Sequence, residues 1–175
     1  MKHFDAIVIG CGILGCMTAR NLRRWHISTL LIEKEADLCT GITRANSAIV
    51  YAGYDNKPGS RKSELTVRGN ANMASLCEEL EVPFSRCGSL LVTYDHASVP
   101  KLEQKLKNGI ANGVPGLRLL TGAEAEAMEP MLRKGVAAAL YAPSTGTVNP
   151  WQLFKIVVVS AVVSFAVKVK VGVVS

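Results

Sequence analysis

The sequence FDAIVIGCGILGCMTARNLRRWHISTLLIE, residues 4–33, predicts a turn and a helix between two strands. Residues 4–10 form a short apolar run rich in isoleucine and valine, which is typical of a strand buried on both faces. Glycines then interrupt the run, apolar residues recur at helical spacing, and residues 28–33 form a second apolar strand. The predicted helix keeps its arginines for the solvent side and its C-terminal end: Arg20, Arg23 and Arg24. The stretch therefore predicts a βαβ unit with two parallel strands.

The glycine spacing Gly10-x-Gly12-x-x-Gly15 is typical of dinucleotide-binding turns. The first glycine allows the tight turn, the second lets a pyrophosphate approach the backbone, and the third lets the helix pack on the strand. The helix N-terminus adds N–H groups and a partial positive charge for the phosphates. Glu33, at the end of the second strand, is placed to accept hydrogen bonds from a ribose. A glycine turn without a ligand is the weaker interpretation, because the strand, the helix and the acidic residue all accompany the motif.

A polar segment, residues 41–47, follows the βαβ unit. Its side chains could donate hydrogen bonds along a long dinucleotide: Thr43, Arg44, Asn46 and Ser47. Its composition fits an ordinary surface loop equally well. The glycine motif does not distinguish NAD from FAD, so the residues alone leave the kind of dinucleotide open.

The rest of the chain predicts a change of architecture near residue 83. A long helix is expected over residues 60–80, with apolar positions at Leu65, Met73, Leu76 and Leu80. Three strands should follow, over residues 88–94, 117–120 and 136–141. An intervening helix should carry the apolar stripe Val99, Leu102, Leu106 and Ile110. Thr121 and Glu124 have capping-box spacing for a short helix, so this block predicts an α+β insertion.

Composition and charge limit the classes of function. The chain has 175 residues, 49% of them hydrophobic, and a formal net charge of +6. Such a chain can bury a core, which excludes a disordered tail or a small disulfide-stapled scaffold. No acidic residue follows Glu129, so most of the excess positive charge lies near the C-terminal end. Because no basic face with interleaved aromatic residues is evident, we expect no nucleic-acid partner.

The five cysteines form no C-x-x-C motif, which predicts free thiols and a reducing cytoplasm. The histidines lie at no ligand spacing from one another or from the cysteines, so we expect no metal site. Asn149 and Pro150 predict a helix starting at Trp151. The valine-rich residues 154–175 are expected to form a buried helix leading into a strand, because their apolar core is too short to span a bilayer. A segment lying on a membrane surface is the weaker alternative. We expect a cytoplasmic location and no transmembrane segment, with peripheral contact at the inner membrane face as a further option.

Several segments, taken in order, resemble the D-amino-acid-oxidase-like FAD-dependent oxidoreductases. They are residues 5–33, 43–54 (TRANSAIVYAGY) and 57–60 (KPGS), followed by 82–84, 88–90, 128–130, 139–143 and 146–151. Within this family the chain is most similar to the branch that contains glycerol-3-phosphate dehydrogenases and L-2-hydroxyglutarate oxidases. The resemblance covers about residues 4–153, and its ordered motifs are more specific than the glycine motif alone.

The resemblance implies an α/β fold in which a Rossmann-like FAD-binding βαβ domain is interrupted by an α+β substrate domain, both incomplete. The expected divisions are residues 1–82 for the first part of the FAD-binding domain, 83–145 for part of the substrate or cap domain, and 146–175 for a return to the FAD-binding domain with an atypical valine-rich tail. Members of the family continue far beyond this length, so the resemblance implies an N-terminal fragment.

The implied cofactor is FAD, and the implied reaction is oxidation of a small hydroxy-bearing substrate, of the glycerol 3-phosphate or 2-hydroxy-acid type, by hydride transfer to the flavin. The electron acceptor is left open. The predicted cofactor-binding residues are Gly10, Gly12, Ile13, Gly15, Glu33, Lys34, Thr43, Arg44, Asn46 and Ser47. The family has a histidine where this chain has Tyr51, and a phenol is a poorer general base near neutral pH than an imidazole. No catalytic residue is therefore assigned, and Tyr51 fits a half-buried strand aromatic equally well.

Two alternatives remain beside this enzyme. One is a truncated, non-catalytic nucleotide-binding fragment. The other is an NAD-dependent dehydrogenase, which residues 43–54 make less favourable.

Overall fold

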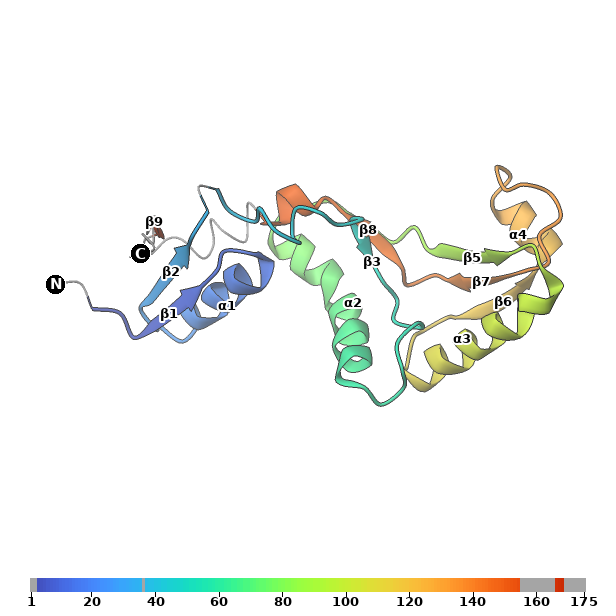
Figure 1. Cartoon of the computed structure of the whole chain (residues 1–175), viewed down its shortest axis with the longest axis horizontal. Coiled ribbons are helices and arrows are strands. Elements are labelled where there is room, and N and C mark those ends of the chain that lie inside the picture. The colour runs from blue at the N-terminus through green and yellow to red at the C-terminus, as the bar shows by residue number, and fades with distance from the viewer. Residues whose placement is uncertain (1–2, 36, 155–165, 169–175) are drawn as a thin grey trace, which may run out of the picture. The chain divides into compact units, whose positions relative to one another are not determined.

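A computed structural model describes residues 3–35, 37–154 and 166–168 (Figure 1). Contacts within the chain divide it into two compact units. Unit 1 consists of residues 1–48, 80–82 and 149–175, and unit 2 consists of residues 49–79 and 83–148. The domain boundaries expected at residues 82 and 145 stay a prediction.

Unit 1 contains the predicted βαβ unit. Strand β1 (Ala6–Ile9) leads through the glycine turn into helix α1 (Ile13–Arg23), and strand β2 (Thr29–Glu33) follows. β1 and β2 pair in parallel, and β9 (Ala166–Lys168) pairs in parallel with the other edge of β2. The prediction of strand, turn, helix and parallel strand is confirmed.

The prediction that the first strand is buried on both faces is wrong for the described residues. Val8 faces α1, since its side chain lies behind Gly15. Ile7 and Ile9 point to the opposite face and are 59% and 84% exposed. The assignment of Arg20 to the solvent side is also wrong, because this residue is buried and has an interaction partner. Arg20 and Arg23 do lie in the last turn of α1, at its C-terminal end, as predicted.

The smaller antiparallel sheet of unit 2 has a central strand from late in the chain. Strand β8 (Gly146–Val148) pairs on one side with β3 (Ile49–Val50) and on the other with β4 (Phe84–Ser85). Thr147 is the position opposite both Ile49 and Ser85. The strand β8 therefore joins two segments that lie far before it in the sequence.

The larger antiparallel sheet of unit 2 has the order β5-β7-β6. Its strands are β5 (Ser89–Thr93), β7 (Ala138–Ala142) and β6 (Arg118–Thr121). A 3-10 turn (His96–Ser98) precedes helix α3 (Val99–Ala111), which packs on β7 and β6 (Figure 1). Helix α4 (Gly122–Met128) begins with the predicted capping box of Thr121 and Glu124. Antiparallel strands with helices on the sheet confirm the α+β block.

One of the core clusters of unit 2 lies between α3 and the larger sheet. Leu102 on α3 packs with Leu140 and Ala138 of β7. The predicted stripe is wrong at its last position, because Ile110 is 63% exposed. Gly109 takes the buried place instead, and a methyl group there would lie 2.1 Å from the Leu117 side chain. The helix therefore approaches Leu117, the residue before β6, more closely than a side chain at position 109 would permit.

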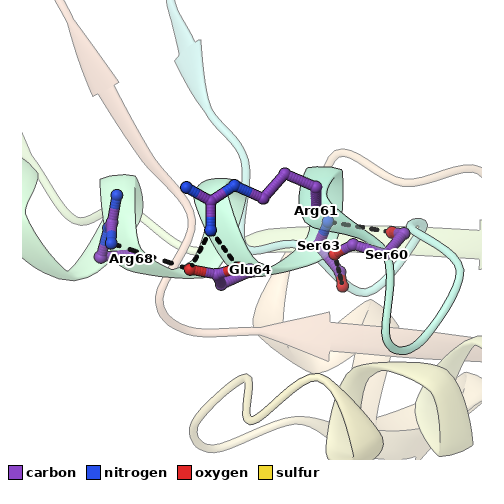
Figure 2. A network of polar contacts seen from close by, with 5 residues as sticks. All are labelled: Ser60, Arg61, Ser63, Glu64 and Arg68. Carbon is purple, nitrogen blue, oxygen red and sulfur yellow. Dashed lines mark hydrogen bonds and ion pairs between the residues drawn. The ribbon is translucent and has the colours of Figure 1, made fainter.

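Helix α2 (Arg61–Glu79) begins at a serine cap (Figure 2). Ser60 Oγ accepts a hydrogen bond from the N–H of Ser63, which satisfies one of the free N–H groups of the first turn. Arg61 and Arg68 both pair with Glu64, and these exposed ion pairs contribute little stability. The helix start at residue 61 agrees with the prediction.

The buried side of α2 agrees only in part with the predicted apolar positions, because Leu80, just after the helix, is buried and Met73 and Leu76 are half-buried. The buried residues are Ser63, Asn70 and Cys77, whereas Leu65 is exposed. Asn70 is buried because its side-chain amide makes hydrogen bonds to neighbouring backbone groups. The prediction of the buried side used the spacing of apolar residues alone, so it could not identify Asn70 as a buried position.

Near the C-terminal end, Asn149 Oδ1 accepts hydrogen bonds from the N–H groups of Trp151 and Gln152, which confirms the predicted helix start. The helix expected in the valine-rich tail lies outside the described residues, and the strand expected after it is represented by β9. Among the described residues, no helix is both long and apolar enough to cross a bilayer.

Candidate dinucleotide site

The glycine turn between β1 and α1 is closely packed at one of its three glycines. A Cβ atom on Gly15 would lie 1.9 Å from the carbonyl oxygen of Gly10, so only glycine fits there. A Cβ atom on Gly12 would lie 3.4 Å from Thr43 Oγ1, which is ordinary contact. Gly10 itself has φ +99°, a backbone conformation that other residues rarely adopt. Close packing thus requires glycine at position 15 and the backbone conformation favours it at position 10, whereas neither requires it at position 12.

Glu33 fixes the turn from the end of β2. Its Oε2 accepts a hydrogen bond from the N–H of Cys11 at 2.7 Å, and its Oε1 accepts one from the N–H of Glu35 at 3.0 Å. The N–H groups of Glu35 and then Cys11 lower the pKa of the Glu33 carboxyl. An ionised carboxylate can accept about four hydrogen bonds, so Glu33 retains acceptor positions beyond these two.

The segment after β2 is connected to α1 through Thr43. Its Oγ1 accepts a hydrogen bond from the N–H of Ile13 at 3.1 Å, in the first turn of α1. Asn46 connects the loop internally, since its Nδ2 donates to the carbonyl of Thr43 and its Oδ1 accepts from the N–H of Ala48. Thr43 therefore orders the turn, a role that the sequence did not predict.

A cavity of about 950 Å³ adjoins the turn, within unit 1. The predicted cofactor-binding residues that line it are Gly10, Gly12, Ile13, Glu33, Lys34 and Thr43. The remaining four, Gly15, Arg44, Asn46 and Ser47, do not line it. Gly15 acts inside the turn and Asn46 inside the loop. The sequence missed Cys39 and Thr40, and it named Gly41 and Ile42 only as part of the polar segment 41–47; all four line the wall.

Large apolar side chains surround this cavity although they face solvent. Ile9, Leu14 and Ile42 are 84%, 82% and 89% exposed, and all three line the cavity. Apolar surface gathered around a concave site is typical of a ligand-binding cleft.

Behind the turn lies a group of three buried cysteines that the sequence did not bring together. The thiols of Cys16 and Cys39 both donate to the carbonyl oxygen of Cys11, at 3.5 and 3.1 Å. Burial raises the pKa of Cys16 to about 12 and that of Cys11 to about 11, so these thiols stay protonated near neutral pH. The hydrogen bond from the Cys39 thiol holds residue 39 against the turn, and so it positions the start of the segment that ends at Thr43.

The turn therefore fits a dinucleotide. The first turn of α1 offers N–H groups and a positive helix end, Gly12 leaves the approach open, and the adjoining cavity is large enough for more than one ring system. Fold and site together define a dinucleotide-binding βαβ unit. Residues 5–161 match the model of the family described as FAD dependent oxidoreductase. The chain belongs to this family, whose cofactor is FAD.

Comparisons with individual proteins agree with this family. The chain is 43% identical over 149 residues to a glycerol 3-phosphate dehydrogenase of Caloramator mitchellensis, covering 85% of this chain and 31% of that protein. It is 35% identical over 150 residues to the human mitochondrial L-2-hydroxyglutarate dehydrogenase, covering 85% of this chain and 32% of that protein. The chain thus spans about a third of the length of these relatives.

Among solved structures, the fold is similar to an L-alpha-glycerophosphate oxidase of Mycoplasma pneumoniae that has FAD bound. The TM-score is 0.84 at 23% identity, covering 92% of this chain and 43% of that one. The predicted family, fold class and cofactor are confirmed, and the assignments of individual cofactor-binding residues stay predictions.

Proposed function

We propose that this chain carries the FAD-binding part of an enzyme that oxidises a small hydroxy-bearing substrate of the glycerol 3-phosphate or 2-hydroxy-acid type. The observation that supports it best is the cavity at the glycine turn, with its exposed apolar rim. The substrate class follows from the two relatives, because one is named for glycerol 3-phosphate and the other for L-2-hydroxyglutarate.

In this proposal the pyrophosphate lies over Gly12 and the first turn of α1. The N–H groups of that turn other than that of Ile13, which donates to Thr43 Oγ1, then donate to phosphate oxygens, and the helix end favours their negative charge. Glu33 keeps the turn in shape through the Cys11 N–H and accepts hydrogen bonds from the ribose with its remaining lone pairs. Ile9 and Leu14 exclude water from the bound nucleotide.

When bound, the flavin supplies a two-electron acceptor. Thr43 and Asn46 keep residues 43–48 ordered, and this segment leads directly into β3. Tyr51 follows β3 and is 57% exposed, so its phenol is reachable by a small molecule. No catalytic residue is proposed. The cytoplasmic location, the peripheral contact with a membrane and the domain boundaries remain predictions.

Flavin binding is tested first. The purified chain should be yellow, with absorbance at about 450 nm, or should become so on addition of FAD. Gly12→Ala should weaken this binding at least about tenfold, whereas Gly69→Ala on α2, where a methyl group meets nothing within 4 Å, should leave it unchanged. A colourless chain that takes up no FAD would contradict the proposal.

Substrate oxidation is tested separately, under anaerobic conditions. Glycerol 3-phosphate, L-2-hydroxyglutarate and other 2-hydroxy acids are added to the FAD-loaded chain. Loss of the flavin absorbance band at about 450 nm reports that the added compound has been oxidised. Bleaching by one of them supports the full proposal. Flavin binding without bleaching by any of them supports a nucleotide-binding chain and contradicts the oxidation step for this chain.

A further inference from the structure

Strand β5 (Ser89–Thr93) is an edge strand of the larger sheet of unit 2 (Figure 1). The sheet has the order β5-β7-β6, so β5 pairs with a strand on one side only. Among the described residues, the backbone hydrogen bonds of β5 run to β7 and to Ala137, which directly precedes β7. In an antiparallel sheet, every second residue of an edge strand directs its N–H and C=O groups away from the sheet. The outer edge of β5 therefore offers a row of backbone groups to a further strand.

Both faces of β5 are covered, so its open side is this edge. Leu91 packs with Leu140 of β7 in the cluster beneath α3. Leu90 and Val92 point to the other face and pack against the cluster that contains Ala125 of α4. A helix laid along the edge would leave the outward backbone groups unpaired, whereas a strand would pair with each of them. The partner that this edge fits is therefore a strand.

The sequence of β5, SLLVT, lacks the features that keep sheet edges from pairing. Natural edge strands are protected by charged side chains, by proline or by a very short length. β5 has five residues and contains neither a charge nor a proline. At the opposite edge of the same sheet, β6 carries the charge of Arg118. The edge strands of the smaller sheet, β3 and β4, have only two residues each.

β5 is also complementary to itself in the antiparallel direction. Residues that lie opposite each other in two paired strands face the same side of the sheet. When two copies are centred on Leu91, this residue lies opposite its own copy and Leu90 lies opposite Val92. Ser89 then lies opposite Thr93. Apolar residues thus meet apolar residues and hydroxyls meet hydroxyls, and all residues of the strand take part.

We propose that two copies of this chain associate through their β5 edges and join their three-stranded sheets into one continuous antiparallel sheet. A two-fold axis perpendicular to the sheet relates the copies, so the α3 helices of both lie on the same face. Because the pairing involves one short strand from each copy, its dissociation constant should be on the order of 100 μM. The competing occupants are a strand of another protein and a strand of a longer form of this one, and either would leave the isolated chain monomeric.

The first test follows backbone amide exchange in the ¹⁵N-labelled chain without flavin, at about 20 μM and about 1 mM. The outward N–H groups of β5 should exchange about fourfold more slowly in the concentrated sample, because most copies are then paired. The N–H groups of β6 are the internal control and should exchange at the same rate in both samples. Sedimentation over this range should show the average mass rising from that of one chain towards that of two.

Charged variants test the register. Ser89→Lys combined with Thr93→Lys places like charges opposite each other at both ends of the pairing, so this double variant should be monomeric. Ser89→Glu combined with Thr93→Glu should be monomeric for the same reason. An equal mixture of the two double variants should dimerise, because every lysine then lies opposite a glutamate. Gln104→Lys combined with Ala111→Lys adds the same charge at exposed positions of α3 and should leave the wild-type dimer unchanged.

The exchange test on the unaltered chain decides the proposal even if the charged variants fold poorly. Concentration-dependent protection confined to β5, together with dimerisation of the mixed variants, supports it. The proposal is overturned if the chain stays monomeric at about 1 mM or if β1 or β6 is protected in place of β5. It is also overturned if the charged variants are folded and their mixture remains monomeric.

Discussion

The carboxylate of Glu33 accepts a hydrogen bond from the backbone N–H of Cys11, with 2.7 Å between Oε2 and N. The last residue of β2 therefore holds the turn that follows β1. A residue expected to bind a ribose thus has a second function in the protein itself, and the two functions can be separated experimentally.

Glu33→Gln should reduce the dependence of stability on acid. The pKa of Glu33 is lowered in the folded chain, so its contribution is complete above the unfolded value of 4.5 and is lost as the pH falls through the lower folded value. Urea unfolding at about pH 7 and about pH 3 measures this contribution. The variant should be less stable at the higher pH and should lose less stability on acidification.

Glu35→Gln is the matched control, because the Glu35 side chain makes an exposed ion pair with Lys34. It should behave as the wild type does at both pH values. An equal loss of acid dependence in both variants would show that the Cys11 contact contributes nothing specific.

Gly15→Ala should damage folding, whereas Gly12→Ala should spare it. The methyl group would overlap the Gly10 carbonyl in the first variant and touch Thr43 at an ordinary distance in the second. We expect a loss of about 3 kcal/mol or more for Gly15→Ala and less than about 1 kcal/mol for Gly12→Ala. Thermal unfolding without flavin measures both, and equal losses would contradict the described packing of the turn.

The cysteines should differ sharply in reactivity. Cys87 is exposed, whereas Cys11, Cys16 and Cys39 are buried with a raised pKa and Cys77 is buried on α2. Alkylation of the native chain at about pH 8, followed by mass spectrometry, should modify Cys87 rapidly and the others only after unfolding. Rapid labelling of Cys16 in the native chain would be inconsistent with the buried cluster.

Asn70→Ala should destabilise unit 2 by about 2–4 kcal/mol. The substitution removes the contacts to three carbonyl oxygens and leaves Arg86 without one of its acceptors. Asn72→Ala, at an exposed position of the same helix, should change stability by less than about 0.5 kcal/mol. Denaturant unfolding of both variants checks this, and a small effect at Asn70 would contradict the described network.

The sequence predicted most of the local structure. Apolar periods, the capping box at Thr121 and the cap at Asn149 are determined by neighbouring residues, and all are present. Burial was predicted less well because it depends on distant segments. Ile110 and Leu65 follow the helical period, yet Gly109 and Asn70 occupy the buried places, since close approach and backbone carbonyls decide those contacts.

In the candidate site, too, some features could be predicted from the sequence and others could not. The glycines and Glu33 could be located because their spacing along one βαβ unit is fixed by the geometry of that unit. The three cysteines around the Cys11 carbonyl could not, because their spacing reveals no common function and only folding brings Cys39 to the turn. A polar loop that interacts with a helix through one threonine leaves no periodic signal.

The central position of β8 also has a consequence for the order of folding. Ile49 pairs with Thr147, about a hundred residues later, and the Asn70 side chain donates a hydrogen bond to the carbonyl oxygen of Ser144. Pairings between such distant residues form slowly, because a long loop must close before any contact compensates for its lost entropy. During synthesis, β3 and β4 therefore leave the ribosome without a partner strand, and their sheet can only assemble once Gly146–Val148 has emerged.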